Sequence, residues 1–266
     1  MSSAKVNKVQ RSCKRNATEH LRRFVVYAKS QLNDARYYPP YEGYRYIAAL
    51  ALYSKCITVA EATITLLEAG FQEEAFGMTR TLVDIFITLH YIGNSDTDNR
   101  AQRFCRFYAK DSEEWTKIIA DYWPLSAQPL GPKTKLIAAQ YASPHKWSGK
   151  SVKEMALEPD TVETDPATGK PAVHDFAYRV IYRLTSHYVH PTIAALGNHV
   201  VQAGRDVFLV HGRSRDDKRY MSAFNIAAYV ANTMIVFYRC MGDPQPERLG
   251  RWAGAIVAHI GRRHKS

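Results

Sequence analysis

Apolar residues recur at helical spacing along most of the chain, and glycine, proline or asparagine closes most of these runs. The pattern predicts helices at residues 17–35, 42–69, 71–92, 96–122, 173–190, 191–202 and 219–241. Between them, residues 123–172 are rich in proline, glycine and serine, which predicts a long irregular insertion with one or two short helices. Because helices dominate, we expect an all-α helical bundle.

This pattern also predicts how the chain is divided. We expect a single helical domain at residues 17–242 that contains the insertion 123–172. Residues 1–16 are basic and polar and predict a poorly ordered segment, whereas residues 243–266 predict a basic C-terminal helix or tail. The apolar run at 207–210, followed by a charged turn, predicts a short β-hairpin near residues 206–218.

The helix predicted at residues 96–122 has the clearest two-sided pattern. Its apolar side predicts a core face, formed by Phe104, Phe107, Tyr108, Trp115, Ile118, Ile119 and Tyr122. Its other side carries a basic stripe, formed by Arg103, Arg106, Lys110 and Lys117. Such a stripe is either an ordinary solvated face or a surface that follows a phosphate backbone.

Charge and cysteine content narrow the class of protein. The formal net charge is +11, and the basic excess lies at the two ends of the chain, which favours a polyanionic partner or simply keeps the protein soluble. The four cysteines are widely spaced and form no metal-ligand motif, which predicts a reduced cytoplasmic protein without structural zinc. The longest apolar run, 221–238, contains two asparagines, so we expect a buried helix and no membrane partner.

Two charged residues interrupt the apolar helix at 71–92. Arg80 and Asp84 lie four residues apart, a spacing typical of an ion pair within one helix. They also belong to a longer polar stripe, formed by Glu73, Gly77, Arg80, Asp84, Thr88 and Tyr91. That stripe favours a polar seam through the bundle, in which the charges need partners on another helix.

The helix at 173–190 carries a second polar stripe. It consists of Arg179, Arg183, Ser186 and His190, with His187 at its edge. Since residues seven apart return to nearly the same helix face, Arg183 and His190 are expected to lie together. If the two stripes face one another, they form an anion site in which Arg80, Asp84 and Arg179 bind phosphate and a histidine moves protons. The alternative is a solvated helix face without chemistry.

Three short segments together resemble a known group of proteins. They are Arg80-x-x-x-Asp84, Trp147-Ser-Gly-Lys-Ser151, and Tyr182-x-x-x-Ser186-x-x-Val189-His190-Pro191. Their order resembles an uncharacterised bacterial family of helical proteins, itself similar to the HEPN superfamily (higher eukaryotes and prokaryotes nucleotide-binding), over roughly residues 45–240. The resemblance implies a helical bundle that forms a homodimer. Many HEPN proteins are metal-independent ribonucleases of toxin–antitoxin and phage-defence systems.

The resemblance also assigns roles to residues of the second stripe. Arg183 and His190 match the superfamily's Arg-x6-His motif, although its second position, often Asn, Asp or His, is Leu184 here. It implies that His190 assists attack of an RNA 2′-hydroxyl and that Arg183 stabilises the transition state, with Ser186 and His187 beside them. No cofactor is expected, and RNA and an antitoxin or defence-system protein are the expected partners.

The sequence leaves one other class of function open and argues against a second. A non-catalytic HEPN-like module could use the same residues to bind a nucleotide or a protein. A metal–carboxylate enzyme in a helical bundle needs Glu-x-x-His pairs on facing helices, and the sequence contains none.

Overall fold

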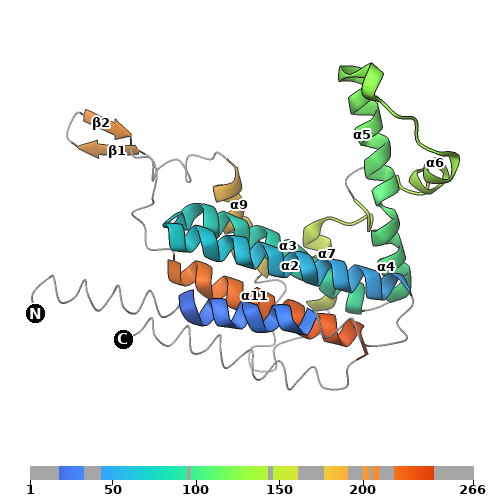
Figure 1. Cartoon of the computed structure of the whole chain (residues 1–266). Helices are drawn as coiled ribbons and strands as arrows, with labels where there is room; N and C mark the ends of the chain where they lie inside the picture. The colour runs from blue at the N-terminus through green and yellow to red at the C-terminus, as the bar shows by residue number, and fades with distance from the viewer. Residues whose placement is uncertain are drawn as a thin grey trace, which may run out of the picture.

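The structure is a computed structural model that describes residues 18–32, 43–94, 97–142, 146–160, 177–190, 200–203, 206–209 and 219–242. The predicted all-α class is confirmed. Four long helices lie side by side, as Figure 1 shows. They are the helix at residues 18–32, α2 (Tyr44–Ala69), α3 (Gln72–Asn94) and α11 (Arg219–Cys240). The predicted segments 1–16 and 243–266 lie outside the described residues.

Helix α3 is the centre of this bundle, because it packs against both α2 and α11. The core is aromatic where α2 meets α11, since the rings of Tyr53 and Phe237 stack with centroids 4.5 Å apart. By length and composition, α2 and residues 221–240 of α11 could each cross a membrane. Core helices of soluble proteins pass the same test, and 72% of the α11 window is buried inside the bundle.

A tight turn at Gly70 makes α2 and α3 antiparallel neighbours. Gly70 has a φ of 91°, a left-handed conformation that glycine adopts without a steric cost. The Phe71 N–H donates to the Leu66 carbonyl at 2.9 Å, so the turn also supplies a hydrogen-bond donor to a carbonyl in the last turn of α2. The helix boundary predicted at this glycine is confirmed.

An arm leaves the bundle after α3, at the right of Figure 1. It consists of α4 (Thr97–Arg106), α5 (Tyr108–Tyr122), the 3₁₀ turn η2 (Pro124–Ser126) and α6 (Pro132–Ala138). The single helix predicted here is therefore wrong, because a turn at Phe107 divides it. The hydroxyl of Tyr141 donates to the Arg103 carbonyl at 2.8 Å and holds the returning chain against α4.

The arm also corrects the predicted core face. From Tyr108 onward the large apolar side chains of α5 are mainly exposed, including Trp115 at 63% and Tyr122 at 74%. A periodic pattern shows that one face is apolar, but it carries no information on whether another element covers that face. Within the predicted basic stripe, Lys110 and Lys117 form ion pairs with Glu113 and Glu114 of the same helix.

The rest of the chain adds short elements. The insertion contains α7 (Val152–Asp160) besides α6, as predicted. Strands β1 (Val200–Ala203) and β2 (Asp206–Leu209) form an antiparallel hairpin in which Val200 pairs with Leu209. The helix predicted to continue to residue 202 is therefore wrong. The apolar run predicted as a strand at 207–210 is confirmed as β2, whose partner β1 precedes it and contains β-branched Val200 and Val201. The rest of the hairpin predicted near 206–218 lies outside the described residues.

Candidate functional site

The site begins where α3 and α9 (Arg183–Val189) come close together. A Cβ built at Gly77 of α3 would lie 3.6 Å from the backbone carbon of Tyr188, an ordinary van der Waals distance, so the two elements pack closely here. Beside it, the rings of Phe76 and Tyr188 meet edge to face, with centroids 5.3 Å apart. This packing places the end of α9 over the next turn of α3, which carries Arg80.

A π-helical segment, η3 (Ala177–Tyr182), leads into α9. Short π-helical segments insert an extra residue per turn and are frequent at functional sites. Here Tyr182 is the last residue of the segment, and its ring stacks on that of Tyr178 with centroids 5.2 Å apart. The wider turn changes the helical register before Arg183.

Arg80 is the centre of the candidate site. One terminal nitrogen, Nη2, donates to the Tyr182 hydroxyl at 2.8 Å, and the guanidinium carbon lies 4.7 Å from the centre of the Tyr182 ring. The other, Nη1, lies 3.1 Å from Nε2 of His190. An arginine carries only donors, so in this contact Nε2 of His190 is the acceptor, and its lone pair receives the hydrogen bond from Arg80. Nε of Arg80 is buried and has no hydrogen-bond partner within the described structure.

Asp84 lies one turn further along α3. Burial raises the pKa of its carboxyl to about 6, although the positive charge of Arg80 acts in the opposite direction. The ion pair predicted between Arg80 and Asp84 is wrong, since none joins these two residues, both of which the structure describes. Arg80 turns instead towards Tyr182 and His190. The alternative prediction, a polar stripe whose charge finds partners on another helix, is confirmed at Arg80.

Arg183 and His190 are both exposed, and no hydrogen bond among the described residues joins them. The spacing argument treats His190 as helical, but α9 ends at Val189 and His190 is extended, with φ −101° and ψ 144°. A residue before proline is excluded from helical geometry by the proline ring, and Pro191 follows His190. The side chain of His190 is therefore placed by this extended backbone and not by the helical period.

The other predicted residues of this stripe do not meet Arg80 in the contacts that define the site. Ser186 donates its hydroxyl to the Tyr182 carbonyl of its own helix at 2.6 Å. Arg179 and His187 are exposed on η3 and α9. Tyr182 is the residue that the sequence analysis did not assign to the site. The sequence feature that could have identified Tyr182 is its place at the start of the segment Tyr182-x-x-x-Ser186.

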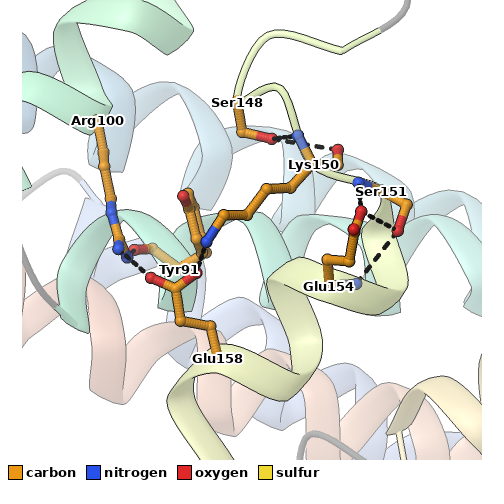
Figure 2. Close-up of polar contacts among 7 residues, drawn as sticks. All are labelled: Tyr91, Arg100, Ser148, Lys150, Ser151, Glu154 and Glu158. Atoms are coloured by element: carbon orange, nitrogen blue, oxygen red, sulfur yellow. Dashed lines mark hydrogen bonds and ion pairs between the residues drawn. The ribbon is translucent and has the colours of Figure 1, made fainter.

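The segment Trp147–Ser151 has a structural role (Figure 2). Ser151 and Glu154 form a reciprocal capping box at the start of α7, with the Ser151 N–H donating to Glu154 at 2.6 Å. Lys150 pairs with Glu158 of α7, which Arg100 of α4 also contacts. Burial opposes ionisation of Glu158, but the hydrogen bonds from Lys150 and Arg100 outweigh it and lower the pKa of this carboxyl.

This ionic cluster is anchored on α3. Arg100 donates to the Tyr91 carbonyl at 2.6 Å, and its guanidinium carbon lies 3.8 Å from the centre of the Tyr91 ring. Trp147 meets the same ring edge to face at 5.8 Å. The cluster therefore ties the insertion to the bundle, and each of its cations already has a carboxylate or an aromatic ring as partner. No group of three potential metal ligands occurs within the described ranges.

Comparison with known proteins places the chain in a family without assigning a function. Residues 46–207, more than half of the chain, match a family of unknown function named DUF5677. No curated protein matches, and no solved structure matches. The match includes Arg80, Tyr182 and His190, and the family description carries no link to HEPN proteins, so that resemblance stays a prediction. The chain belongs to the DUF5677 family.

Proposed function

We propose that this chain is a metal-independent ribonuclease of the HEPN type, acting in a toxin or phage-defence system, whose catalytic group is His190. The observation that carries the proposal is the 3.1 Å contact between Arg80 Nη1 and His190 Nε2. It puts a permanent cation beside an imidazole that can accept a proton once Arg80 binds phosphate, and the two residues lie 110 positions apart in the sequence. Metal-independent cleavage of an RNA phosphodiester can use a proton acceptor and a cation of these kinds.

The proposed chemistry follows from these two groups. When RNA binds, Nη1 of Arg80 turns from Nε2 of His190 to the phosphoryl oxygens, and the lone pair that this releases on Nε2 accepts the proton of the RNA 2′-hydroxyl, whose oxygen attacks the adjacent phosphorus. The phosphorus–O5′ bond breaks, leaving a 2′,3′-cyclic phosphate, and the departing oxygen takes up a proton from solvent. Negative charge develops on the phosphoryl oxygens, which the planar guanidinium of Arg80 can bind with two parallel hydrogen bonds.

Tyr182 and Arg183 have supporting roles in this proposal. The Tyr182 hydroxyl and ring hold Arg80 from one side, so less conformational freedom is lost when phosphate binds. Arg183 is exposed in the free protein and, as the resemblance implies, contacts the phosphate only when RNA is present. The surrounding charge favours such a substrate, since the chain carries a net charge of +11.

The test is cleavage of labelled RNA by the purified chain in the presence of EDTA, resolved on a denaturing gel. His190→Ala and Arg183→Ala are each expected to abolish cleavage, while Arg80→Lys, which keeps the charge but loses the two-pronged donor, reduces it at least tenfold. Arg23→Ala is the matched control, because Arg23 is an exposed arginine on the helix at 18–32, far from Arg80 in the sequence, and forms a surface ion pair with Glu19 of the same helix. Circular dichroism verifies folding. Cleavage at the wild-type rate by both alanine variants would reject the site.

One observation favours the non-catalytic alternative, a nucleotide- or protein-binding module. Arg80 is already engaged by Tyr182 and His190, and the Ser186 hydroxyl is engaged by its own helix, so the cluster can serve to lock α9 onto α3. In that case the wild-type chain binds RNA or nucleotide without cleaving it. His190→Ala would then lower the midpoint of thermal unfolding, and the RNA on the gel would stay intact for every variant.

A further inference from the structure

A narrow polar strip of α3 is partly exposed to solvent in the middle of an otherwise buried stretch of that helix. We call it the α3 strip, and it consists of Arg80, Thr81, Asp84 and Thr88. The residues between them are apolar and buried, namely Leu82, Val83, Ile85, Phe86 and Ile87. Positions three and four apart lie side by side on a helix, so the other three members of the strip all neighbour Asp84. The strip is therefore one surface with a carboxylate at its middle and a guanidinium at one end.

The middle of the α3 strip lacks hydrogen-bond partners within the part of the chain that the structure describes. Asp84, Thr81 and Thr88 form no hydrogen bond there, and Arg80 is the charge that acts on Asp84. Other helical threonines, such as Thr63 and Thr185, donate their hydroxyls to a carbonyl of their own helix. The polar groups of the strip are therefore available to a ligand.

The Asp84 carboxylate determines what kind of ligand fits. Its pKa of about 6 leaves it mainly ionised at neutral pH, and an ionised carboxylate carries only acceptors. A partly buried charge without donors is costly, so a ligand that supplies two N–H groups to it gains affinity. An ionised carboxylate also repels phosphate. In a bound nucleotide, the phosphate therefore belongs on Arg80, and Asp84 contacts another part of the molecule.

Guanine is the RNA base whose hydrogen-bonding edge matches this carboxylate. Its Watson–Crick edge has two adjacent donors, N1–H and the N2 amine, beside the acceptor O6. Adenine and cytosine place a ring acceptor beside their amine, and uracil has one N–H between two carbonyls. Among the four bases, guanine alone can therefore give this edge's two hydrogen bonds to one carboxylate. The hydroxyls of Thr81 and Thr88 flank Asp84 and can donate to O6.

The position of Asp84 relative to Arg80 suits one nucleotide. The two residues lie on successive turns of α3, and one turn rises about 5.4 Å. Because the ribose separates phosphate from base, a phosphate on the Arg80 guanidinium leaves the base within reach of the next turn. Nη1 of Arg80 lies 3.1 Å from Nε2 of His190, so that phosphate also lies beside the proposed proton acceptor.

We propose that Asp84 is the specificity-determining residue of the candidate site and binds the guanine base of a nucleotide whose phosphate lies on Arg80. This inference rests on the proposed function, because it takes RNA as the ligand. It adds a substrate preference, namely cleavage next to guanosine, and it gives a role to a carboxylate that cannot bind phosphate itself.

The first test is isothermal titration calorimetry of the full chain with DNA trinucleotides, which cannot be cleaved because they lack the 2′-hydroxyl. The sequence T-G-T is expected to bind about tenfold more tightly than T-I-T, since inosine lacks only the N2 amine that donates to the charged carboxylate. Asp84→Asn is expected to bind both equally. Asp121→Asn is the matched control, because it removes an exposed carboxylate of α5. Circular dichroism verifies folding. Equal affinity of the wild type for both trinucleotides, or a preference that survives Asp84→Asn, would overturn the proposal.

Mapping the ends of a cleaved RNA of mixed sequence distinguishes this proposal from the proposed function. The wild type is expected to cut next to guanosine, and Asp84→Asn to cut the same RNA without that preference. Cleavage by the wild type with no base preference would reject the guanine site and leave the ribonuclease standing. Guanine-selective binding that depends on Asp84, without cleavage of any RNA, would support the guanine site and reject the ribonuclease.

Discussion

At the scale of single residues, Asp84 has the most unusual environment. Its carboxyl is largely buried on an otherwise apolar helix, and burial raises its pKa to about 6 from an ordinary value of 3.8. At neutral pH the ionised form therefore costs folding free energy. Natural proteins keep such a group mainly where function requires it, because apolar packing would be more stable.

Asp84→Asn tests this interpretation. The folded state holds the proton more tightly than the unfolded state, so the stability contribution of Asp84 is present below pH 4 and is lost as the pH rises through 6. The variant is expected to be more stable than the wild type by about 1–3 kcal/mol at pH 7.5 and to match it near pH 4. Urea denaturation at both pH values measures the difference. Asp121→Asn, at an exposed position of α5, is the control, and an equal effect of Asp84→Asn at both pH values would contradict the prediction.

His190 shows what residue-level sequence analysis can and cannot supply. The sequence identified Arg80 and His190 as candidates, and the structure brings them together. The prediction that the two stripes face one another brings Arg80 near a histidine of the second stripe, but it treats His190 as helical. Pro191 was the signal against that assumption, since the residue before a proline leaves the helix. Which partner an extended residue then finds depends on tertiary packing that the sequence pattern does not encode.

At the scale of elements, the helices could be predicted more reliably than their surroundings. The long helices α2, α3 and α11 lie where apolar periodicity and terminating glycines place them. The exposure of the apolar side of α5 could not be predicted, because the same apolar spacing is found in a core helix and in a helix whose apolar side is in solvent. Strand β1 was missed because two β-branched residues within an apolar run match both a helix and a strand.

Substituting alanine for either of two glycines in α3 tests how closely the neighbouring elements pack against that part of the helix. A Cβ at Gly77 would make only ordinary contacts, 3.6 Å from Tyr188, whereas a Cβ at Gly93 would lie 3.0 Å from Cys240 Sγ and 3.3 Å from Val236 Cγ1. Gly77→Ala is therefore expected to stabilise the protein by about 0.5–1 kcal/mol through higher helix propensity. Gly93→Ala is expected to destabilise it by about 1–3 kcal/mol through overpacking.

The two variants serve as controls for each other, because both make the same change in the same helix. Urea denaturation at pH 7.5 measures both differences in the free energy of unfolding. A loss of stability in Gly77→Ala would show that α9 approaches α3 more closely than the structure describes. An unchanged stability in Gly93→Ala would show that Cys240 moves aside.

At the scale of the whole molecule, the described bundle and the excess of basic residues lie in different parts of the chain. The described bundle contains the candidate site, whereas the basic excess lies towards the two ends of the chain. Residues 1–16 contain five lysines and arginines and no acidic residue. In the proposed ribonuclease, the bundle supplies the chemistry, and the ends supply attraction for the phosphate backbone that does not depend on RNA sequence.

Deleting residues 1–16 separates these two contributions. Each cation that contacts a phosphate releases a counterion, so the logarithm of RNA affinity falls with the logarithm of salt concentration in proportion to the number of contacts. The deletion is expected to weaken RNA binding at 50 mM salt at least tenfold and to make the salt dependence shallower, as fluorescence anisotropy would measure. Because His190 and Arg80 remain, the rate of cleavage at saturating protein should be unchanged. A salt dependence identical to that of the full chain would instead assign these residues to solubility, which is the other role that a basic terminus can serve.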